Sequence, residues 1–369
     1  MTARIYLSAG EPSGDLHGAG VAAAIRALAP DAALEGMGGP HMEAAGVRLV
    51  EGIGRLGAIG LVEAAASLPS HLMALHRARR RLGTACYDAA VLIDYPGFHL
   101  RLLSAAARHG VPVLYFIPPQ LWAWGAGRAA RLREAGVTVA AILPFEQEYF
   151  ESLHVVTRFV GHPLLDRASP PDRAAGRGRL GLGTHTPVLA LAPGSRPAEV
   201  RRLWPILAAA ARHLRTTVPD LEIVLAATGD HTYPESGDLI VRWNDTPAVL
   251  AAADAALCKS GTATLEAALV DTPLVVVYAM HPLTFAVARR VVHTPHVALV
   301  NLVAGREVAP EYLQDRATPE RLAAAIAPLL AADREPARLQ RAGFADVRAR
   351  LGTPGASRRV AEMALELAA

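Results

Sequence analysis

In each half of this chain, short apolar runs alternate with longer helical runs, and this pattern constrains the fold more than any other feature of the sequence. In the first half, apolar runs of strand length occupy residues 4–9, 89–93, 112–117, 137–143 and 157–160. In the second half, similar runs occupy residues 187–192, 221–227, 239–243, 255–258 and 273–278. Strands and helices that alternate in this way form parallel, doubly wound sheets. We therefore predict an α/β protein with two Rossmann-like domains in tandem.

Composition marks the division between these domains. Residues 165–185 are rich in Pro, Gly, Arg and Asp, as linkers often are. We predict a first domain over residues 1–168 and a second over residues 169–344. The tail has two helical stretches split by Gly352-Thr353-Pro354-Gly355. We expect its last part, from about residue 345 to 369, to return to the first domain.

Composition also excludes several classes of protein. A chain of 369 residues with 52% hydrophobic content can bury two cores. It has no apolar run of membrane-spanning length, and residues 1–9 do not resemble a signal peptide, so we expect a cytoplasmic location. A net charge of +3 with 5% aromatic residues does not predict nucleic-acid binding. Cys86 and Cys258 lack metal-type spacing, and we expect both to be buried, with no metal site.

Two loops of the first half carry candidate site residues. Residues 9–18, AGEPSGDLHG, join a strand to a helix, and their amides could hold an anion or a sugar hydroxyl. Glu11, Ser13 and Asp15 belong to this loop, although Ser13 or Asp15 could simply cap the helix. Glu35 follows about 20 residues later, which leaves a dinucleotide site open, but the glycine spacing does not fit one.

Asp94 follows a buried strand and precedes a Pro-Gly turn, a position suited to a general base. An Asp that only forms a turn is the alternative. His99 is expected at the surface or at a helix start. Trp122 and Trp124 come after the next strand, where they could pack in the core, stack on a sugar or contact acyl chains.

Two loops of the second half are typical of phosphate binding. Residues 191–199 deliver Arg196 at a strand-helix junction, and its guanidinium can bind phosphate with two hydrogen bonds. In the other loop, Ser260, Gly261 and Thr262 would turn amides and hydroxyls toward a pyrophosphate at a helix N-terminus. Glu266 lies one turn further and could accept ribose hydroxyls.

Two other features of this half are less definite. Asn301, Arg306 and Glu307 surround a Gly turn and could read polar groups of a nucleotide sugar. Lys259, the only lysine, precedes the second phosphate-type turn, and its side chain could simply point to solvent.

Taken together, eight motifs resemble those of the lipid-A-disaccharide synthase family. They run in order from near the first residue to past residue 314: AGEPSGDLHGA, IDYPGFHLRL, PPQLWAWG, LPFEQEYF, FVGHPLLD, LAPGSR, SGTATLEAAL and NLVAGREVAPEYLQ. The resemblance implies the GT-B architecture, with two facing Rossmann-like domains. It also implies an inverting transfer in which the 6-hydroxyl of 2,3-diacylglucosamine 1-phosphate attacks UDP-2,3-diacylglucosamine. The products are a β-1,6-linked disaccharide and UDP, and neither a cofactor nor a metal is implied.

The resemblance also assigns roles to residues. It implies that Asp94 is the general base and that Glu11, Ser13 and Asp15 lie near the reacting sugars. The residues implied on the UDP side are Arg196, Ser260, Gly261, Thr262, Glu266, Asn301, Arg306 and Glu307. The chain departs from the family pattern at Pro12, where Thr is more usual, at His99, where Asn is common, and at residues 119–121.

Both implied substrates are acylated, so we expect peripheral association with the inner face of the inner membrane. Leu61, Leu68, Leu72 and Leu75 fall on one stripe of a predicted helix over residues 60–82, with basic residues nearby. A core-facing amphipathic helix is the alternative. A homodimer is left open.

Rival interpretations are a peptidoglycan GlcNAc transferase, a UDP-GlcNAc 2-epimerase, a nicotinamide-dependent dehydrogenase and a non-catalytic sugar- or lipid-binding protein.

Overall fold

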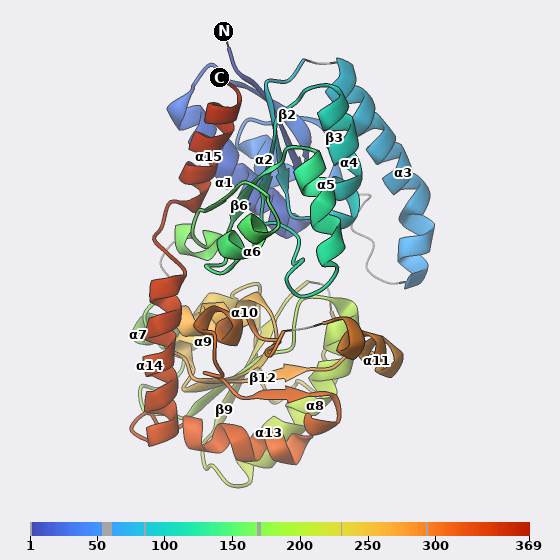
Figure 1. The fold of residues 1–369 in the computed structure, drawn as a ribbon. Helices are drawn as coiled ribbons and strands as arrows, with labels where there is room; N and C mark the ends of the chain where they lie inside the picture. Colours follow the sequence, from blue (N-terminus) through green and yellow to red (C-terminus); the bar gives the residue numbers. More distant parts are fainter. Residues whose placement is uncertain (1, 54–60, 85, 168–170, 230, 293) are drawn as a thin grey trace. The chain divides into compact units, whose positions relative to one another are not determined.

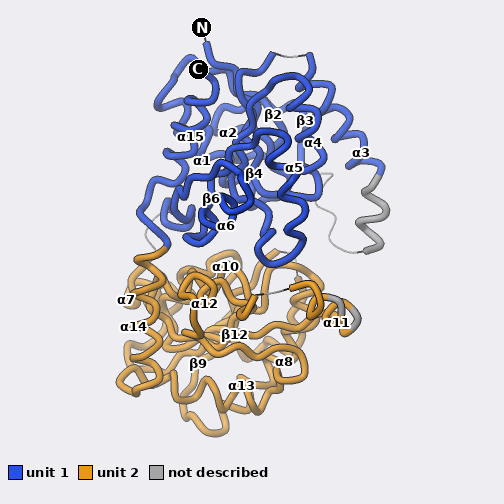
Figure 2. Tube along the Cα trace, in the orientation of Figure 1, with its two compact units in different colours: residues 1–167, 351–369 blue, residues 168–350 orange. Residues whose placement is uncertain are grey.

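The computed structural model describes the backbone of residues 2–53, 61–84, 86–167, 171–229, 231–292 and 294–369. It describes the side chains of these residues except 61–68, 283 and 287. The chain divides into two compact units, shown in Figures 1 and 2. Unit 1 comprises Met1–Arg167 with Leu351–Ala369, and unit 2 comprises Ala168–Arg350.

A parallel sheet of seven strands forms the centre of unit 1. Its strands lie in the order β3-β2-β1-β4-β5-β6-β7. They are β1 (Arg4–Ala9), β2 (Ala33–Gly38), β3 (Arg48–Gly52), β4 (Ala89–Ile93), β5 (Val113–Phe116), β6 (Thr138–Ala141) and β7 (Thr157–Phe159). Every residue of β4 and β5 is buried. Parallel strands covered on both faces have such continuous apolar runs, which is why the sequence located these two so closely.

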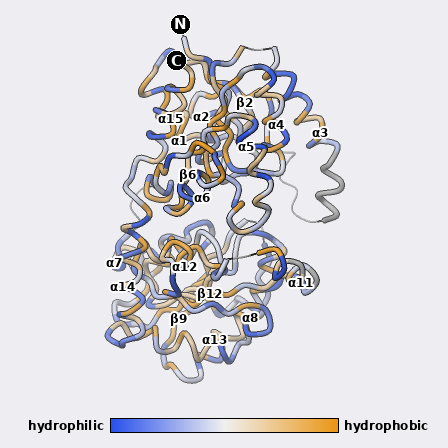
Figure 3. Tube along the Cα trace, in the orientation of Figure 1, coloured by the Kyte–Doolittle hydropathy of each residue, from blue (hydrophilic) through white to orange (hydrophobic). Residues whose placement is uncertain are grey.

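Helices cover both faces of this sheet. They are α1 (Pro12–Leu28), α2 (Pro40–Ala44), α3 (Leu61–Thr84), α4 (Pro96–Arg108), α5 (Ala129–Glu134), α6 (Glu146–Ser152) and α15 (Ala356–Leu367), with 3-10 turns at Ala126–Arg128 and Pro163–Asp166. One face of α15 packs into the same hydrophobic core as β1 and α1. Hydrophilic and hydrophobic residues alternate along residues 69–84 of α3 (Figure 3).

A second parallel sheet forms unit 2, in the order β10-β9-β8-β11-β12-β13. Its strands are β8 (Val188–Ala192), β9 (Glu222–Ala227), β10 (Ile240–Trp243), β11 (Ala255–Lys259), β12 (Leu274–Tyr278) and β13 (Glu311–Leu313). Its helices are α7 (Arg173–Leu180), α8 (Pro197–Arg215), α9 (Thr246–Ala252), α10 (Thr262–Leu269), α11 (Pro282–Val291), α12 (Leu299–Ala304), α13 (Pro319–Ile326) and α14 (Glu335–Arg350), with 3-10 turns at Gln314–Arg316 and Ala327–Leu329.

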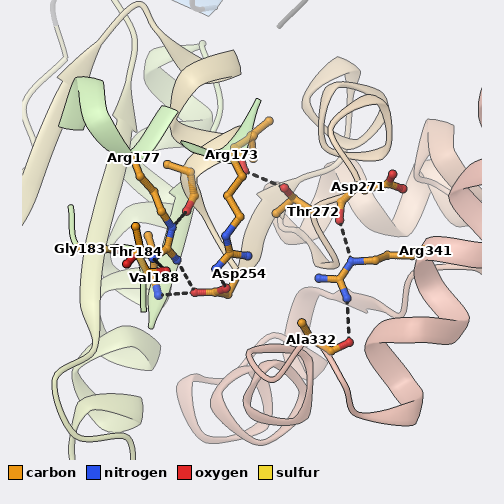
Figure 4. A network of polar contacts seen from close by, with 12 residues as sticks. Arg173, Arg177, Gly183, Thr184, Val188, Asp254, Asp271, Thr272, Ala332 and Arg341 are labelled. Atoms are coloured by element: carbon orange, nitrogen blue, oxygen red, sulfur yellow. Dashed lines mark hydrogen bonds and ion pairs between the residues drawn. The ribbon is translucent and has the colours of Figure 1, made fainter. Parts of the chain in front are cut away.

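A buried ionic network ties α7 to this sheet (Figure 4). The carboxylate of Asp254 pairs with Arg177 at 2.9 Å and with Arg173, and it accepts a hydrogen bond from the Val188 amide at 2.8 Å. Arg177 is only 3% exposed and also donates to the carbonyl of Ala252. A buried charge without its partner is costly, so loss of any member of this network should destabilise the packing of α7 against β8.

The structure corrects the sequence-based description in three places. Strands β2, β3 and β13 were not predicted. Helix α14 continues to Arg350, so the return to unit 1 begins at Leu351 and not at about residue 345, because the helix runs on until the 352–355 interruption. Cys258 is buried as expected, but Cys86 is exposed and has a left-handed backbone (φ 49°).

No helix within the described part of the chain combines the length and the apolar character needed to cross a membrane.

Candidate functional site

In each unit, two predicted loops lie where the strand order reverses. In unit 1, β1 and β4 are neighbours, and Ala9 pairs with Ile93 at their carboxyl ends. In unit 2, β8 and β11 are neighbours, and Ala192 pairs with Cys258. Ligands of open α/β sheets bind at such switch points, beyond the carboxyl ends of the strands. We call the segments that follow these strands the β1 turn (residues 10–11), the β4 turn (94–95), the β8 turn (193–196) and the β11 turn (260–262).

The β4 turn holds Asp94 in an unusual and well-supported conformation. Asp94 and Tyr95 both have left-handed backbones, with φ values of 51° and 50°. The carbonyl oxygen of Asp94 accepts hydrogen bonds from the Tyr115 hydroxyl at 2.8 Å and from Nδ1 of His99 at 2.7 Å. Left-handed residues other than glycine persist only when their surroundings fix them, and they cluster at functional sites.

His99 lies in the first turn of α4, so of its two expected positions the helix start is confirmed, but the side chain is fully buried and not at the surface. A carbonyl oxygen can only accept, so Nδ1 carries the proton and Nε2 accepts from the Ser8 hydroxyl, 2.8 Å away. Burial lowers the pKa of His99 to about 4, and its hydrogen bond to Asp94 opposes this only in part. His99 is therefore a neutral support for the β4 turn.

The β1 and β4 turns contact each other through Tyr95. A Cβ atom added at Gly10 would lie 2.0 Å from Cδ1 of Tyr95, so the ring lies directly on this glycine. Burial, and next the nearby Glu11 carboxylate, raise the pKa of Tyr95 to about 12. The His71 ring of α3 lies 6.2 Å from the Tyr95 ring. Glu11 and Asp94 are thus brought together at the switch point of unit 1.

The two other predicted residues of this loop differ from each other. Ser13 is exposed. Asp15 is 1% exposed, and its carboxylate accepts from the amides of Gly39 at 2.7 Å, Met42 at 3.0 Å and His41 at 3.0 Å. Neither caps α1, whose N-cap residue is Glu11. The Asp15 carboxylate therefore holds the start of α2, and its place near the reacting sugars stays a prediction.

The tryptophans that follow β5 separate into one anchored and one exposed residue. Trp122 donates from Nε1 to the buried carboxylate of Glu146 at 3.1 Å. Burial raises the pKa of Glu146 to about 7, although bonds from Leu143, Trp122 and Ile142 partly offset it. Trp124 is 51% exposed and stacks under Arg128, whose guanidinium carbon lies 4.0 Å from the ring centroid.

The β8 turn presents Arg196 to solvent at the N-cap of α8. Gly194 has a left-handed backbone (φ 112°), and its carbonyl accepts from the Thr228 hydroxyl at 3.0 Å. A ring nitrogen of His231 contacts the carbonyl of Ser195 at 2.9 Å. The turn is thus held by the loop that follows β9, and Arg196 stays exposed at the N-terminal end of the 19-residue helix α8.

The β11 turn leads into α10 with Gly261 as its N-cap residue, at φ 149°. Thr262 is exposed, whereas Ser260 is 6% exposed and donates its hydroxyl to the Val297 carbonyl at 2.8 Å. Glu266 is half-buried one turn into α10. The hydroxyl of Ser260 is therefore occupied, and Gly261 and Thr262 are the residues best placed to meet an anion.

Comparison with known proteins assigns the family. The family model described as lipid-A-disaccharide synthetase matches residues 5–365. The chain belongs to this family. A lipid-A-disaccharide synthase of Anaeromyxobacter sp. (strain K) is 41% identical over 99% of this chain and 97% of its own length. The enzyme of the same name from Geobacter metallireducens is 38% identical with the same coverage.

Solved structures share the fold at low identity. The glycotransferase of kitacinnamycin has a TM-score of 0.62 at 19% identity, over 99% of both chains. Arabidopsis thaliana UGT89C1, complexed with quercetin, has a TM-score of 0.65 at 14% identity, over 100% of this chain and 99% of its own. The fold of this lipid-A-disaccharide synthase family member is therefore GT-B, as predicted.

Family membership decides among the rival interpretations. This member of the lipid-A-disaccharide synthase family is a hexosyltransferase that makes the lipid A disaccharide by glycosyl transfer. The structure of Anabaena Alr3699/HepE in complex with UDP and glucose also shares the fold, with a TM-score of 0.52 at 15% identity, over 99% of this chain and 100% of its own. Glu35 carries no ribose here, since its carboxylate binds Arg48, Arg81 and Tyr87.

The third predicted loop of unit 2 is organised around Asn301. This side chain is fully buried and uses both ends of its amide: Nδ2 donates to Ala309 and Glu311, and Oδ1 accepts from Val308 and Ala309. Arg306 pairs with Asp346 at the surface, at 2.7 Å, and Glu307 is exposed. Asn301 therefore links α12 to residues 308–311, and its role on the UDP side stays a prediction.

The predicted leucine stripe of α3 is only partly described. Leu61, Leu68 and the helix start at residue 60 lie outside the described side chains or backbone. Leu75 is 5% exposed and belongs to the core, whereas Leu72 and Met73 are 52% and 53% exposed. Among the described residues, no group of three or more His, Cys, Asp or Glu side chains could hold a metal ion.

Sequence reasoning missed three contributors to the site. Tyr95 and Tyr115 stand out in no sequence pattern, and the sequence assigns Lys259 no role beyond a side chain that could point to solvent. The Gly10-Tyr95 contact joins residues that are far apart in sequence, so no local pattern could reveal it. Lys259 forms an ion pair with Glu199.

Proposed function

We propose that this enzyme joins UDP-2,3-diacylglucosamine to 2,3-diacylglucosamine 1-phosphate in a β-1,6 linkage. Unit 1 would bind the acceptor and unit 2 the UDP part of the donor. The observation that carries this division is the placement of Asp94, fixed in a left-handed turn at the switch point of unit 1. The exposed guanidinium of Arg196 and the N-terminus of α10 occupy the corresponding position in unit 2.

In the proposed reaction, Asp94 acts as the general base, and Arg196 with the N-terminus of α10 stabilises the leaving group. The Asp94 carboxylate accepts the proton of the acceptor 6-hydroxyl, whose oxygen then forms a bond to the anomeric carbon. The bond from that carbon to the diphosphate oxygen breaks on the opposite face, so the configuration inverts and UDP leaves with the bonding electrons. Arg196 and the amides of the β11 turn stabilise the charge that develops on UDP. In this scheme Glu11 and Ser13 orient the reacting sugars, Glu266 binds the ribose, and no metal or other cofactor takes part.

The acylated substrates place the enzyme at a bilayer. We expect α3 to meet the cytoplasmic face of the inner membrane through Leu72, Met73, His76 and Arg80, all of them exposed. These four residues fall within about 100° of the helix circumference, because successive residues are about 100° apart. An apolar pair flanked by basic groups suits peripheral docking on anionic lipid.

Activity is tested by UDP release from UDP-2,3-diacylglucosamine in detergent and EDTA, with and without the acylated acceptor. We expect release that depends on the acceptor, together with a disaccharide product. Asp94→Asn should abolish turnover and leave UDP affinity unchanged, whereas Arg196→Ala should weaken UDP binding. Near-normal turnover of Asp94→Asn would show that another group is the base, and no release with any acceptor would refute the reaction.

Docking is tested by co-sedimentation with vesicles that contain anionic lipid. Leu72→Gln combined with Met73→Gln should reduce vesicle binding and leave the detergent assay unchanged. Val156→Gln is the matched control, since Val156 is also exposed (70%) but follows α6 and not α3. Equal binding by both variants would refute α3 as the docking helix. Light scattering of the same protein preparations, without vesicles, measures whether a homodimer forms.

A further inference from the structure

The only lysine of the chain lies beside the β8 and β11 turns. Nζ of Lys259 is 2.9 Å from Oε1 of Glu199, in the first turn of α8. The two side chains are only 20% and 15% exposed. Its ammonium is also 5.7 Å from the Tyr278 ring centroid. Lys259 is therefore a half-buried, paired cation and does not extend into solvent.

Each member of this ion pair lies against the backbone of one turn. A Cβ atom added at Gly194, in the β8 turn, would be 2.7 Å from Oε2 of Glu199. A Cβ atom added at Gly261, in the β11 turn, would be 3.4 Å from Nζ of Lys259. The pair thus bridges the two turns, with its cation next to the N-cap residue of α10.

The charges around the β8 and β11 turns indicate what Lys259 does there. The N-terminus of α10 and the guanidinium of Arg196 favour an anion. Glu199 opposes one, because an unpaired carboxylate under the β8 turn would repel a phosphate. Lys259 cancels that repulsion, and its ammonium has three donors, so it can bind phosphate oxygens while it stays near Glu199.

We infer that Lys259 is a further binding residue for the diphosphate of the nucleotide donor, acting with Glu199 as its charge partner. This inference rests on the proposed donor site and extends it. The chemical class that it recognises is the diphosphate of a nucleoside diphosphate, and the uridine and sugar are not involved.

The unique lysine permits a direct test on the unmodified protein. Acetylation by an amine-reactive ester, followed by mass spectrometry, reports on Lys259, with the N-terminal α-amine of the purified protein as an internal reference. Saturating UDP should slow acetylation of Lys259 by about tenfold or more relative to that α-amine, and uridine, which lacks phosphate, should not. Equal acetylation of Lys259 with and without bound UDP would overturn the inference.

Variants test the same point by affinity. Lys259→Met should raise the Kd of UDP by about 10- to 100-fold, as expected for loss of a charge-assisted contact, and should leave the Kd of uridine unchanged. Lys259→Arg should retain UDP binding within a few-fold. In the Lys259→Met background, Glu199→Gln should restore part of the lost affinity, because it removes the carboxylate that the lysine had neutralised.

The possible outcomes distinguish failure of the Lys259 role from failure of the proposed donor site. If wild-type protein binds UDP and Lys259→Met binds it equally well, the role of Lys259 is refuted and the donor site stands. If the double variant is weaker than Lys259→Met, the pair is a structural clasp and the charge argument is wrong. If wild-type protein does not bind UDP, the proposed donor fails and this inference fails with it.

Discussion

The contact between Gly10 and Tyr95 gives the sharpest prediction for the β4 turn. In Gly10→Ala, the new Cβ would lie 2.0 Å from Cδ1 of Tyr95, whereas ordinary contact begins at 3.4 Å. The ring or the alanine must therefore move by about 1.4 Å, the difference between these two distances. Phe98 and His99 limit the movement of the ring, with centroids 5.7 Å and 5.9 Å away.

A shift of the Tyr95 ring by this distance should reach Asp94, the residue that precedes Tyr95 in the chain. Misplacement of a catalytic group by about 1 Å can cost about 100-fold in rate. We expect Gly10→Ala to lower kcat by about 100-fold and the free energy of unfolding by about 1–3 kcal/mol, as overpacking does. UDP affinity should not change, since the nucleotide turns belong to unit 2.

The assay is initial-rate UDP release at saturating donor and acceptor, with urea denaturation and UDP titration of the same samples. Gly97→Ala is the matched control: it adds the same methyl group next to the β4 turn, but nothing lies within 4 Å of the new Cβ. It should keep kcat within about twofold, as a change without steric conflict should. Wild-type kcat in Gly10→Ala, or an equal loss in both variants, would refute the reasoning.

Three further predictions concern buried polar groups. Asp254→Asn leaves Arg177 buried without its carboxylate and should cost about 3–5 kcal/mol in urea denaturation, whereas Arg306→Ala, at an exposed pair, should cost at most about 1 kcal/mol. Burial alone would raise the pKa of Glu35, but bonds from its arginine and tyrosine partners lower it to about 2, from 4.5. The stabilisation by the Glu35 carboxylate is therefore present above pH 4.5 and lost as pH falls toward 2. In thermal melts over this pH range, the Tm of Glu35→Gln should fall less steeply than the Tm of the wild-type protein. His99→Leu should lower kcat about tenfold without changing the pH-rate profile from about pH 6 to 9, since burial keeps this ring neutral there; a lost limb in that range would show that the ring titrates.

The strands that the sequence located well are those with both faces buried. Residues 4–9 and 89–93 were placed correctly because continuous apolar runs leave few alternatives to a buried parallel strand. Strand β2 was missed because it contains Gly36, whose added Cβ would lie 1.7 Å from the Leu7 carbonyl oxygen. Close packing of two strands requires glycine there, and glycine weakens the local strand signal.

The site was predictable at the level of loops and less so at the level of side chains. Each loop follows a recognisable strand. The strand order of each sheet, which places β1 beside β4 and β8 beside β11, cannot be read from the separate motifs. Asp15 and Asn301 look like ligand-binding residues in the sequence, yet their polar atoms are used by backbone amides and carbonyls. Hydrogen-bond partners chosen by the fold are not visible in a motif.

The return of residues 351–369 to unit 1 has a consequence for biosynthesis. Asp166 accepts hydrogen bonds from the amides of Gly355, Ala356 and Ser357, which fixes the start of α15, and Val360 then joins the core beside β1. On the ribosome, all of unit 2 is made before these residues emerge. The first half to be synthesised therefore waits with an open apolar groove until the last helix arrives, and a prematurely terminated chain would expose that groove to chaperones and proteases.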